Sequence, residues 1–427
     1  MEKRKERILL CLCHLSGNEQ KFVQEAFDTN WVVPLGPNVN GFEKDLEEFV
    51  GQNKRVVALS AGTAAVHLAL LNCGVGPGDE VLVQSFTFCA SSHPITYLGA
   101  TPVFIDSEKD TWNMDPELLK EAIKDRIAKT GKKPKAIVPV ALYGMPYKID
   151  RIMEIANKYD IPVVEDAAEG FGSKFNGQVL GTFGKYGVLS FNGNKMITTS
   201  GGGALITENE DEWREIMMYA TQYRESYPYY QHEKIGYNYR MSNICAGIGR
   251  GQMTIADQHI QHHKHVQALY KELLKDVKGV HVHSQPEIMD TRNDGTTGPV
   301  YDSNYWLCTM TIDENLKVRG QENAYKQVIT GAVGGAAGVI HAAESAHTDC
   351  EPNANVEAMR MGLDALNIES RPLWKPMHKQ PVYKNAPAYL NGVSEELFKV
   401  GMCLPAGPYV TEDDVRFICE AIKNLIG

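Results

Sequence analysis

The chain has 427 residues, of which 43% are hydrophobic and 22% are charged, and its formal net charge is −10. This length predicts two domains, and the composition is typical of a globular protein. An acidic balance argues against non-specific binding of nucleic acid, which needs a basic face. It does not exclude an anionic small substrate, because a few cations and helix N-termini can hold one locally. No run approaches the roughly 18 apolar residues of a membrane span, so no membrane insertion is expected.

The nine cysteines are scattered along the chain. Their odd number and the absence of a regular spacing favour reduced thiols over a disulfide framework or a zinc site. We therefore predict a cytoplasmic protein.

From about residue 55 to residue 207, short apolar runs alternate with helical patterns. Several runs lack polar alternation, which is typical of a mainly parallel sheet covered on both faces. This pattern predicts an α/β domain with catalytic groups at the carboxyl ends of its strands. The predicted strands are 56–59, 80–83, 102–105, 136–142, 162–166, 188–191 and 204–207, and the predicted helices are 64–71, 117–127 and 149–158.

A long helical pattern from Ile244 to about Val277 leads away from this region. We therefore divide the chain into a large domain, 1–255, and a smaller C-terminal α+β domain, 256–427. The small domain is expected to contain a strand over 305–312 and a helix over 356–366. A last helix is expected after Thr411, which begins a capping-box-like sequence. The segment 331–338 is rich in Ala and Gly and predicts mobility.

Lys195 stands in a context that favours covalent attachment of a cofactor. Ser190 precedes it by five residues, glycines 201–203 follow it, and Asp166 ends an upstream apolar run. A lysine amine can form a Schiff base with pyridoxal phosphate, exchange with a substrate amine and then move a proton at the substrate carbon. A lone loop lysine is more often a surface residue, but these neighbours favour the Schiff base.

Two carboxylates are candidates for contact with the cofactor ring. Asp166 would pair with the ring nitrogen and keep it protonated, which makes the ring an electron sink. Its alternative role is to cap the following helix, but a carboxylate buried after Val163 and Val164 is costly unless it is paired. Glu169 would either reach the ring hydroxyl or face solvent.

The turn at Gly62 and Thr63 is the candidate cradle for the cofactor phosphate. It joins a predicted strand to a predicted helix, where small residues let backbone N–H groups and the helix dipole meet an anion. The hydroxyls of Thr63 and Ser190 could add hydrogen bonds, although an ordinary turn capped by Thr63 has the same pattern. Phe88 closes another strand and would either stack on the ring or belong to the core.

Together these residues resemble the DegT-type sugar-nucleotide aminotransferases, pyridoxal-phosphate enzymes with the aspartate-aminotransferase fold (fold type I). The resemblance extends from Gly17 to Gly407. Within it, the stretches 192–203 and 371–378 are similar to the branch that aminates C4 of UDP-4-keto-6-deoxy-N-acetylglucosamine. The stretches that carry the wider resemblance include 61–65, 85–88, 99–103, 165–169 and 236–242.

The resemblance implies a homodimer that moves an amino group from glutamate to a keto sugar nucleotide. Asn238 would reach the cofactor phosphate of the neighbouring subunit, and His232 would lie in the same shared region. The residues implied near the sugar nucleotide are Asn30, Trp31, Arg371 and His378. Alternatives within this fold are amination at C3, a dTDP-linked sugar, sugar dehydration or a non-catalytic regulator. Lys195 favours transamination, because related dehydratases carry His in its place.

Two other classes of protein are less well supported by the sequence. A nucleotide-linked oxidoreductase would need a complete GxGxxG at a strand-to-helix turn, and neither Gly170–Gly172 nor Gly247–Gly251 supplies one. A metal protein could use His259, His262, His263 and His265, of which the first three share a helical face. No acidic or Cys partner completes that set, so we expect no metal.

Overall fold

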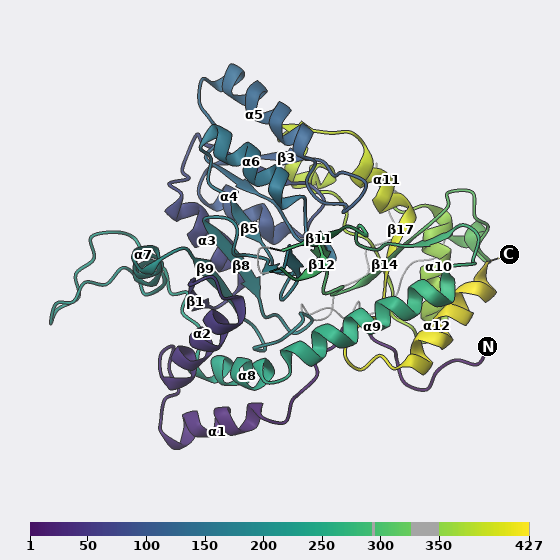
Figure 1. Ribbon diagram of the computed structural model, residues 1–427, viewed down its shortest axis with the longest axis horizontal. Coiled ribbons are helices and arrows are strands. Elements are labelled where there is room, and N and C mark those ends of the chain that lie inside the picture. The colour runs from purple at the N-terminus through teal and green to yellow at the C-terminus, as the bar shows by residue number, and fades with distance from the viewer. Residues whose placement is uncertain (293–294, 326–349, 427) are drawn as a thin grey trace.

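The computed structural model describes residues 1–292, 295–325 and 350–426 (Figure 1). The predicted mobile segment 331–338 lies outside these residues. Two four-stranded sheets form one layer, since bridges pair Ile137 with Val163 and Val140 with Asp166. The first sheet has the order β16-β3-β2-β4 and the second β5-β8-β9-β1. Their strands are β1 (Arg55–Leu59), β2 (Glu80–Gln84), β3 (Thr101–Ile105), β4 (Ala136–Val138), β5 (Val164–Asp166), β8 (Tyr186–Ser190), β9 (Gly203–Thr207) and β16 (Ala388–Tyr389).

All pairings in this layer are parallel except those of β9, which runs against both β8 and β1. The prediction of a mainly parallel sheet is therefore confirmed. Successive residues of a strand face opposite sides. Accordingly, Val56 and Ala58 belong to one hydrophobic core, whereas Val57 and Leu59 belong to another.

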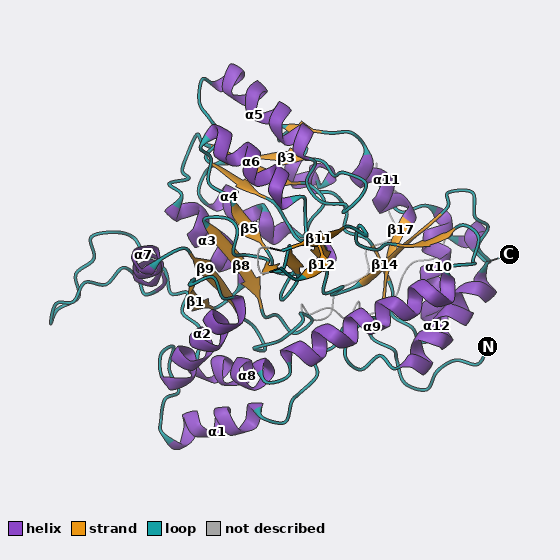
Figure 2. Ribbon diagram, viewed as in Figure 1, coloured by secondary structure: helices purple, strands orange, loops and turns teal. Residues whose placement is uncertain are grey.

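Helices cover both faces of the layer, as Figure 2 shows. The first core contains side chains of α2 (Pro37–Val50), α5 (Pro116–Thr130) and α6 (Ile149–Tyr159). The second contains side chains of α3 (Gly62–Asn72), α4 (His93–Tyr97) and α7 (Glu210–Ala220). The near-continuous apolar character of the strands thus follows from burial on both sides.

A third core lies in the C-terminal part of the chain. It is built on the antiparallel sheet β10-β14-β17-β15. Ile8 joins this core from the N-terminus, so both chain ends meet there (Figure 1). Its elements are β10 (Val280–Val282), β14 (Cys308–Ile312), β15 (Arg371–Pro372), β17 (Gly401–Leu404), α9 (Ala256–Leu274), α10 (Ala354–Ala365) and α12 (Glu412–Leu425).

The remaining regular elements lie around these cores. The helices are α1 (Glu19–Asp28), α8 (Asn243–Met253) and α11 (Val393–Val400), and the strands are β6 (Lys174–Phe175), β7 (Gln178–Val179), β11 (Met289–Thr291), β12 (Thr297–Pro299) and β13 (Tyr301–Asp302). Among the described residues, no helix combines the length and the apolar character needed to cross a bilayer.

The largest differences between the structure and the predicted elements are at three places. The helical pattern 244–277 is two helices, α8 and α9, with the β-branched residues Thr254 and Ile255 between them. The proposed domain boundary at residue 255 falls in this break, and we keep that division as a proposal. The predicted strand 136–142 ends at Val138, because Pro139 has no N–H to continue a ladder. The predicted strand 305–312 begins only at Cys308.

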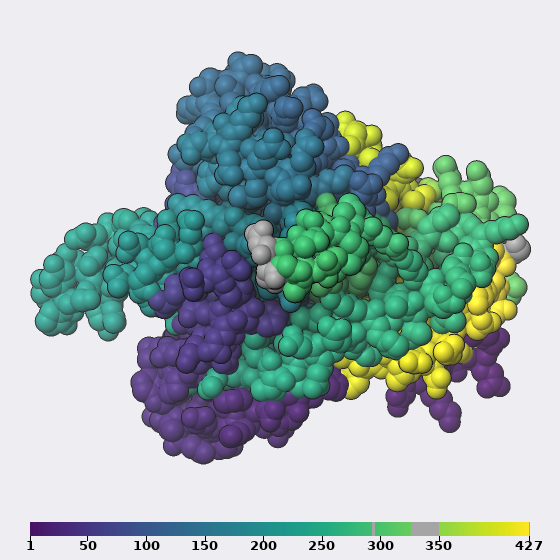
Figure 3. All heavy atoms as spheres, viewed as in Figure 1, coloured from purple at the N-terminus to yellow at the C-terminus, as the bar shows by residue number. Residues whose placement is uncertain are grey.

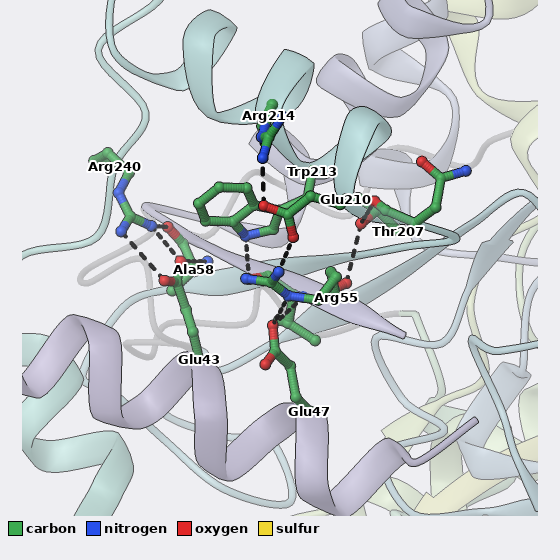
Figure 4. A network of polar contacts seen from close by, with 11 residues as sticks. Glu43, Glu47, Arg55, Ala58, Thr207, Glu210, Trp213, Arg214 and Arg240 are labelled. Carbon is green, nitrogen blue, oxygen red and sulfur yellow. Dashed lines mark hydrogen bonds and ion pairs between the residues drawn. The ribbon is translucent and has the colours of Figure 1, made fainter. Parts of the chain in front are cut away.

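An extended arm, residues 222–238, projects from the body next to α7 (Figures 1 and 3). Its two ends meet where Gln222 N donates to Tyr237 O at 2.9 Å. Just beyond the arm, Arg240 forms an ion pair with Glu43 and donates to Ala58 O at 2.9 Å (Figure 4). The base of the arm is therefore fixed beside the carboxyl end of β1.

Candidate active site

A cavity of about 340 Å³ opens at the carboxyl ends of β1, β5 and β8. Its wall contains Lys195 and six of the seven other residues predicted to contact the cofactor, namely Gly62, Thr63, Phe88, Asp166, Glu169 and Ser190. These positions are up to 133 residues apart in the sequence. They meet because parallel strands end at one edge of the sheet, where open α/β folds bind their ligands.

Lys195 lies between a carboxylate and an aromatic ring. Its Nζ is 3.4 Å from Glu169 Oε1 and 4.0 Å from the ring centroid of Trp306. Glu169 Oε2 also accepts a 2.7 Å hydrogen bond from Tyr143 N. Burial raises the pKa of Glu169, and the nearby charge of Lys195 opposes that rise.

Asp166 is a buried carboxylate at the end of β5. Its Oδ2 accepts from Ser91 Oγ at 2.6 Å and its Oδ1 accepts from Ala168 N at 3.1 Å. Burial raises its pKa, while these hydrogen bonds and the charge of Lys195 act in the opposite direction. Within the described residues Asp166 forms no ion pair, so a cationic ring nitrogen in the cavity would supply the missing charge.

The turn at the start of α3 has the shape of an anion cradle. The helix begins at Gly62, so the first N–H groups of α3 have no partners within the helix. A Cβ on Gly62 would lie 3.1 Å from Ser190 Cβ and 3.4 Å from Leu189 O. Glycine thus permits this close approach of α3 to the end of β8. Thr63 and Ser190 face the same cavity.

Aromatic side chains form another part of the wall. Phe88 is 50% exposed, and its ring centroid is 5.3 Å from that of Trp374. Trp374 is held through its backbone N, which donates to Tyr143 Oη at 2.8 Å. Phe88 is therefore accessible for stacking and is not a core residue. The lysine, the unpaired buried carboxylate, the anion cradle and the accessible ring fit pyridoxal phosphate.

The other predicted residues do not line the cavity of a single chain. Asn30, Trp31, His232 and Asn238 are exposed; His232 and Asn238 belong to the arm. Their predicted roles remain predictions.

Two of the predicted sugar contacts already have partners in their own chain. Arg371 pairs with Glu369 at 2.9 Å. His378 contacts Ser85 Oγ at 2.7 Å and Glu395 Oε1 at 3.1 Å. Both residues belong to the segment that contains Trp374, so they could help to position this part of the wall.

Sequence reasoning missed several residues that the structure brings to the site. Ser91 holds Asp166, whereas Trp306, Asn194 and Trp374 line the cavity. Asn194 adjoins Lys195, and its proximity to the site could have been inferred. Trp374 lies in the stretch 371–378 that carries the resemblance, which was the available signal. Trp306 had no such signal, because an aromatic residue next to an apolar run is more often a core residue.

The imidazoles considered as metal ligands point to separate partners. His259 contacts Met196 O, His262 contacts Gly407 O and His263 contacts Tyr305 O, at 3.0, 3.2 and 3.2 Å. Across the part of the chain that the structure describes, no group of three or more His, Cys, Asp or Glu residues could hold a metal ion.

Comparison with known proteins identifies the family. The model of the DegT/DnrJ/EryC1/StrS aminotransferase family matches residues 14–331 and 340–423. The chain belongs to this family. EpsN of Bacillus subtilis (strain 168), named as a pyridoxal phosphate-dependent aminotransferase, is 41% identical over 98% of this chain and 96% of its own. GDP-perosamine synthase of Escherichia coli O157:H7 is 33% identical, with 96% of both chains covered.

A solved structure supports the same assignment. The crystal structure of a DegT DnrJ EryC1 StrS aminotransferase from Brucella abortus has a TM-score of 0.79 and 27% identity, with 96% of each chain covered. The protein is thus a pyridoxal-phosphate-dependent sugar aminotransferase with the aspartate-aminotransferase-like fold. This confirms the predicted fold class, cofactor and enzyme class.

Proposed function

We propose that the enzyme transfers the amino group of glutamate to C4 of a nucleotide-linked 4-keto-6-deoxy sugar. We choose UDP-4-keto-6-deoxy-N-acetylglucosamine as the first substrate to test. The proposal depends on one observation, the placement of Lys195 between Glu169 and the cofactor cradle in a single cavity. The similarity of 192–203 and 371–378 to the C4-aminating branch supports the choice of sugar.

The residues of the cavity have separate roles in this proposal. Lys195 would hold the cofactor through its Nζ and, when free, move a proton at the substrate carbon. Asp166 would face the ring nitrogen, Gly62 and Thr63 the phosphate, and Phe88 one ring face. When bound, pyridoxal phosphate supplies the electron-accepting ring on which an amino group can be carried from donor to acceptor.

The charges of the cavity support a site shared by two subunits. Asp166, Glu169 and Lys195 are the only charged residues among the described ones that line it. The cofactor phosphate, glutamate and a sugar nucleotide all bring negative charge, which needs more cations than Lys195 alone. The projecting arm carries the cations Arg224 and Lys234 beside Glu225 and Glu233, and Lys234 pairs with Glu215 at 2.6 Å. We propose a homodimer in which this arm, including Asn238 and His232, completes the partner's site.

Mixing two inactive variants tests the shared site. Lys195→Ala and Asn238→Ala subunits, dissociated and reassociated together, should recover about a quarter of the wild-type activity, because half of the random dimers are mixed and each has one intact site. Mixed dimers that form without any recovery would place Asn238 in its own subunit's site, and an active Asn238→Ala variant would place it outside the sites.

A substrate panel tests the reaction itself. The purified protein is incubated with glutamate and with UDP-, GDP- or dTDP-linked 4-keto and 3-keto sugars, and the product is identified by NMR. A GDP-linked sugar is the second candidate, because GDP-perosamine synthase matches along nearly the whole chain. Amination at C3 alone, or loss of water without amination, would contradict the proposal.

We also propose a cytoplasmic location. The cysteines are scattered along the chain and odd in number, as expected in a reducing compartment. Secretion of the native protein with oxidised cysteines would contradict this.

A further inference from the structure

The amine of Lys195 is held between a carboxylate and the face of an indole. Glu169 Oε1 lies 3.4 Å from Nζ, and the indole of Trp306 lies beneath Nζ with its centroid at 4.0 Å. The Lys195 side chain is 14% exposed and that of Glu169 is 5% exposed. Little water therefore competes, and a cation–π contact is strongest when it is desolvated.

Trp306 is fixed independently of Lys195. It is 2% exposed, and its Nε1 donates to Asn194 O at 2.7 Å, on the residue that precedes Lys195. Its backbone N donates to Asn304 Oδ1 at 2.8 Å. The amide Nδ2 of Asn304 donates in turn to Glu169 O and to Phe171 O, both at 2.9 Å. A single side chain thus sets the positions of both groups that hold the lysine.

We propose that Trp306 and Glu169 form a resting place for the Lys195 amine whenever it is not bonded to the cofactor. A lysine side chain has a flexible four-carbon stem, and a freed amine would otherwise sample many orientations. In this role Trp306 is a positioning residue that acts through Lys195. The proposal rests on the proposed role of Lys195 as the cofactor-bearing residue.

A carboxylate and the face of an indole both attract an ammonium group. Between the two halves of the reaction, these two contacts would therefore keep the Lys195 amine close to the cavity. Removing the indole face should free the amine more often, and a freed amine is more accessible to electrophiles.

Chemical labelling of the cofactor-free protein tests this directly. Brief acetylation at fixed pH, followed by peptide mass spectrometry, compares Lys195 with Lys185, which does not line the cavity. In Trp306→Leu the labelling of Lys195 should rise about tenfold, as expected for loss of a desolvated cation–π contact. In Trp306→Phe it should stay within about twofold of the wild type, since the aromatic face remains. Lys185 should not change.

Both variants lose the indole N–H and its hydrogen bond to Asn194 O, but only Trp306→Phe keeps an aromatic face. A difference between the two variants therefore reports the effect of the aromatic face. Equal labelling of Lys195 in the Phe and Leu variants would overturn the proposal, as would wild-type labelling in the Leu variant. Circular dichroism and thermal unfolding check that both variants fold.

A measurement on the wild type covers the case in which the Leu variant does not fold. Reductive ¹³C-methylation of the cofactor-free protein gives a dimethylamine resonance for Lys195, assigned by its absence in Lys195→Arg. Its protons should be shifted upfield by the indole ring current. A resonance at the position of the exposed lysines would overturn the proposal.

The proposed role of Lys195 and the proposed resting place can be contradicted separately. If Lys195→Ala keeps full turnover, the proposed function of Lys195 fails. If Lys195 is essential but its labelling ignores Trp306, only the resting place fails.

Discussion

Replacing Ser91 by alanine should weaken cofactor binding at acid pH and leave it unchanged at higher pH. Ser91 is 1% exposed, and its Oγ donates to Asp166 Oδ2 at 2.6 Å. A hydrogen bond to a charged group is worth about 1.5–3 kcal/mol. Its loss should reduce the ratio of ionised to protonated Asp166 by roughly one to two powers of ten.

The sign of the pH effect follows from the direction of the shift. Burial already raises the pKa of Asp166, and losing a donor to the carboxylate raises it further. The ionised form that pairs with a cationic ring nitrogen is then lost earlier as the pH falls. It is recovered when the pH rises well above the new pKa. The affinity defect should therefore be confined to the acid side.

Titration of the cofactor-free protein with pyridoxal phosphate over a pH series measures this dependence. Ser92→Ala is the matched control, because Ser92 is equally buried but its Oγ donates to Cys89 O at 3.2 Å. Asp166→Asn should bind weakly at every pH. The reasoning is refuted if Ser91→Ala and Ser92→Ala have the same pH dependence of the dissociation constant.

Three further changes test other parts of the structure. Lys195→Ala should keep the fold but lose turnover and covalent cofactor; borohydride treatment and peptide mass spectrometry should find cofactor on Lys195 of the wild type only. Thr411→Ala should cost about 1 kcal/mol of unfolding free energy in urea, since it breaks the capping box with Asp414; Thr411→Ser should restore it. Burial lowers the pKa of His263 to about 3, whereas a histidine in the unfolded chain has a pKa near 6.5. Below that pH the unfolded chain binds a proton that the folded chain does not, so the folded state loses stability as the pH falls. His263→Gln should make the unfolding free energy fall less steeply with acid, by about 1.4 kcal/mol per pH unit, and an unchanged slope would contradict this.

The cofactor-facing part of the site could be predicted because it depends on local signals. Asp166 and Ser190 end apolar runs, and Gly62 follows one at a strand-to-helix turn. Once these runs are placed in a mainly parallel sheet, their carboxyl ends must meet at one edge. The same alternation of apolar runs and helical patterns therefore predicts both the sheet and the meeting of these residues near Lys195.

The rest of the wall could not be predicted, because it depends on contacts between distant segments. Ser91 lies in a short turn and meets Asp166 across 75 positions. Trp306 precedes β14 in a run whose apolar residues predict a strand, and nothing near it indicates a neighbouring lysine. The opposite difficulty applies to Arg371 and His378, which were predicted to lie near the sugar nucleotide. Their polar groups suggest ligands, but the structure pairs them with Glu369 and Glu395.

Asn304 links the two parts of the chain at the site. Asn304 approaches the cavity from the C-terminal half, yet its amide holds the backbone oxygens of Glu169 and Phe171 in the N-terminal half. Its Oδ1 also fixes Trp306, so any shift of this segment would move both groups that contact Lys195. A displacement of Asn304 would therefore change the surroundings of the lysine without any direct contact between Asn304 and Lys195. A buried amide that satisfies three backbone groups is also costly to disrupt, which keeps the two contacts of Lys195 in register.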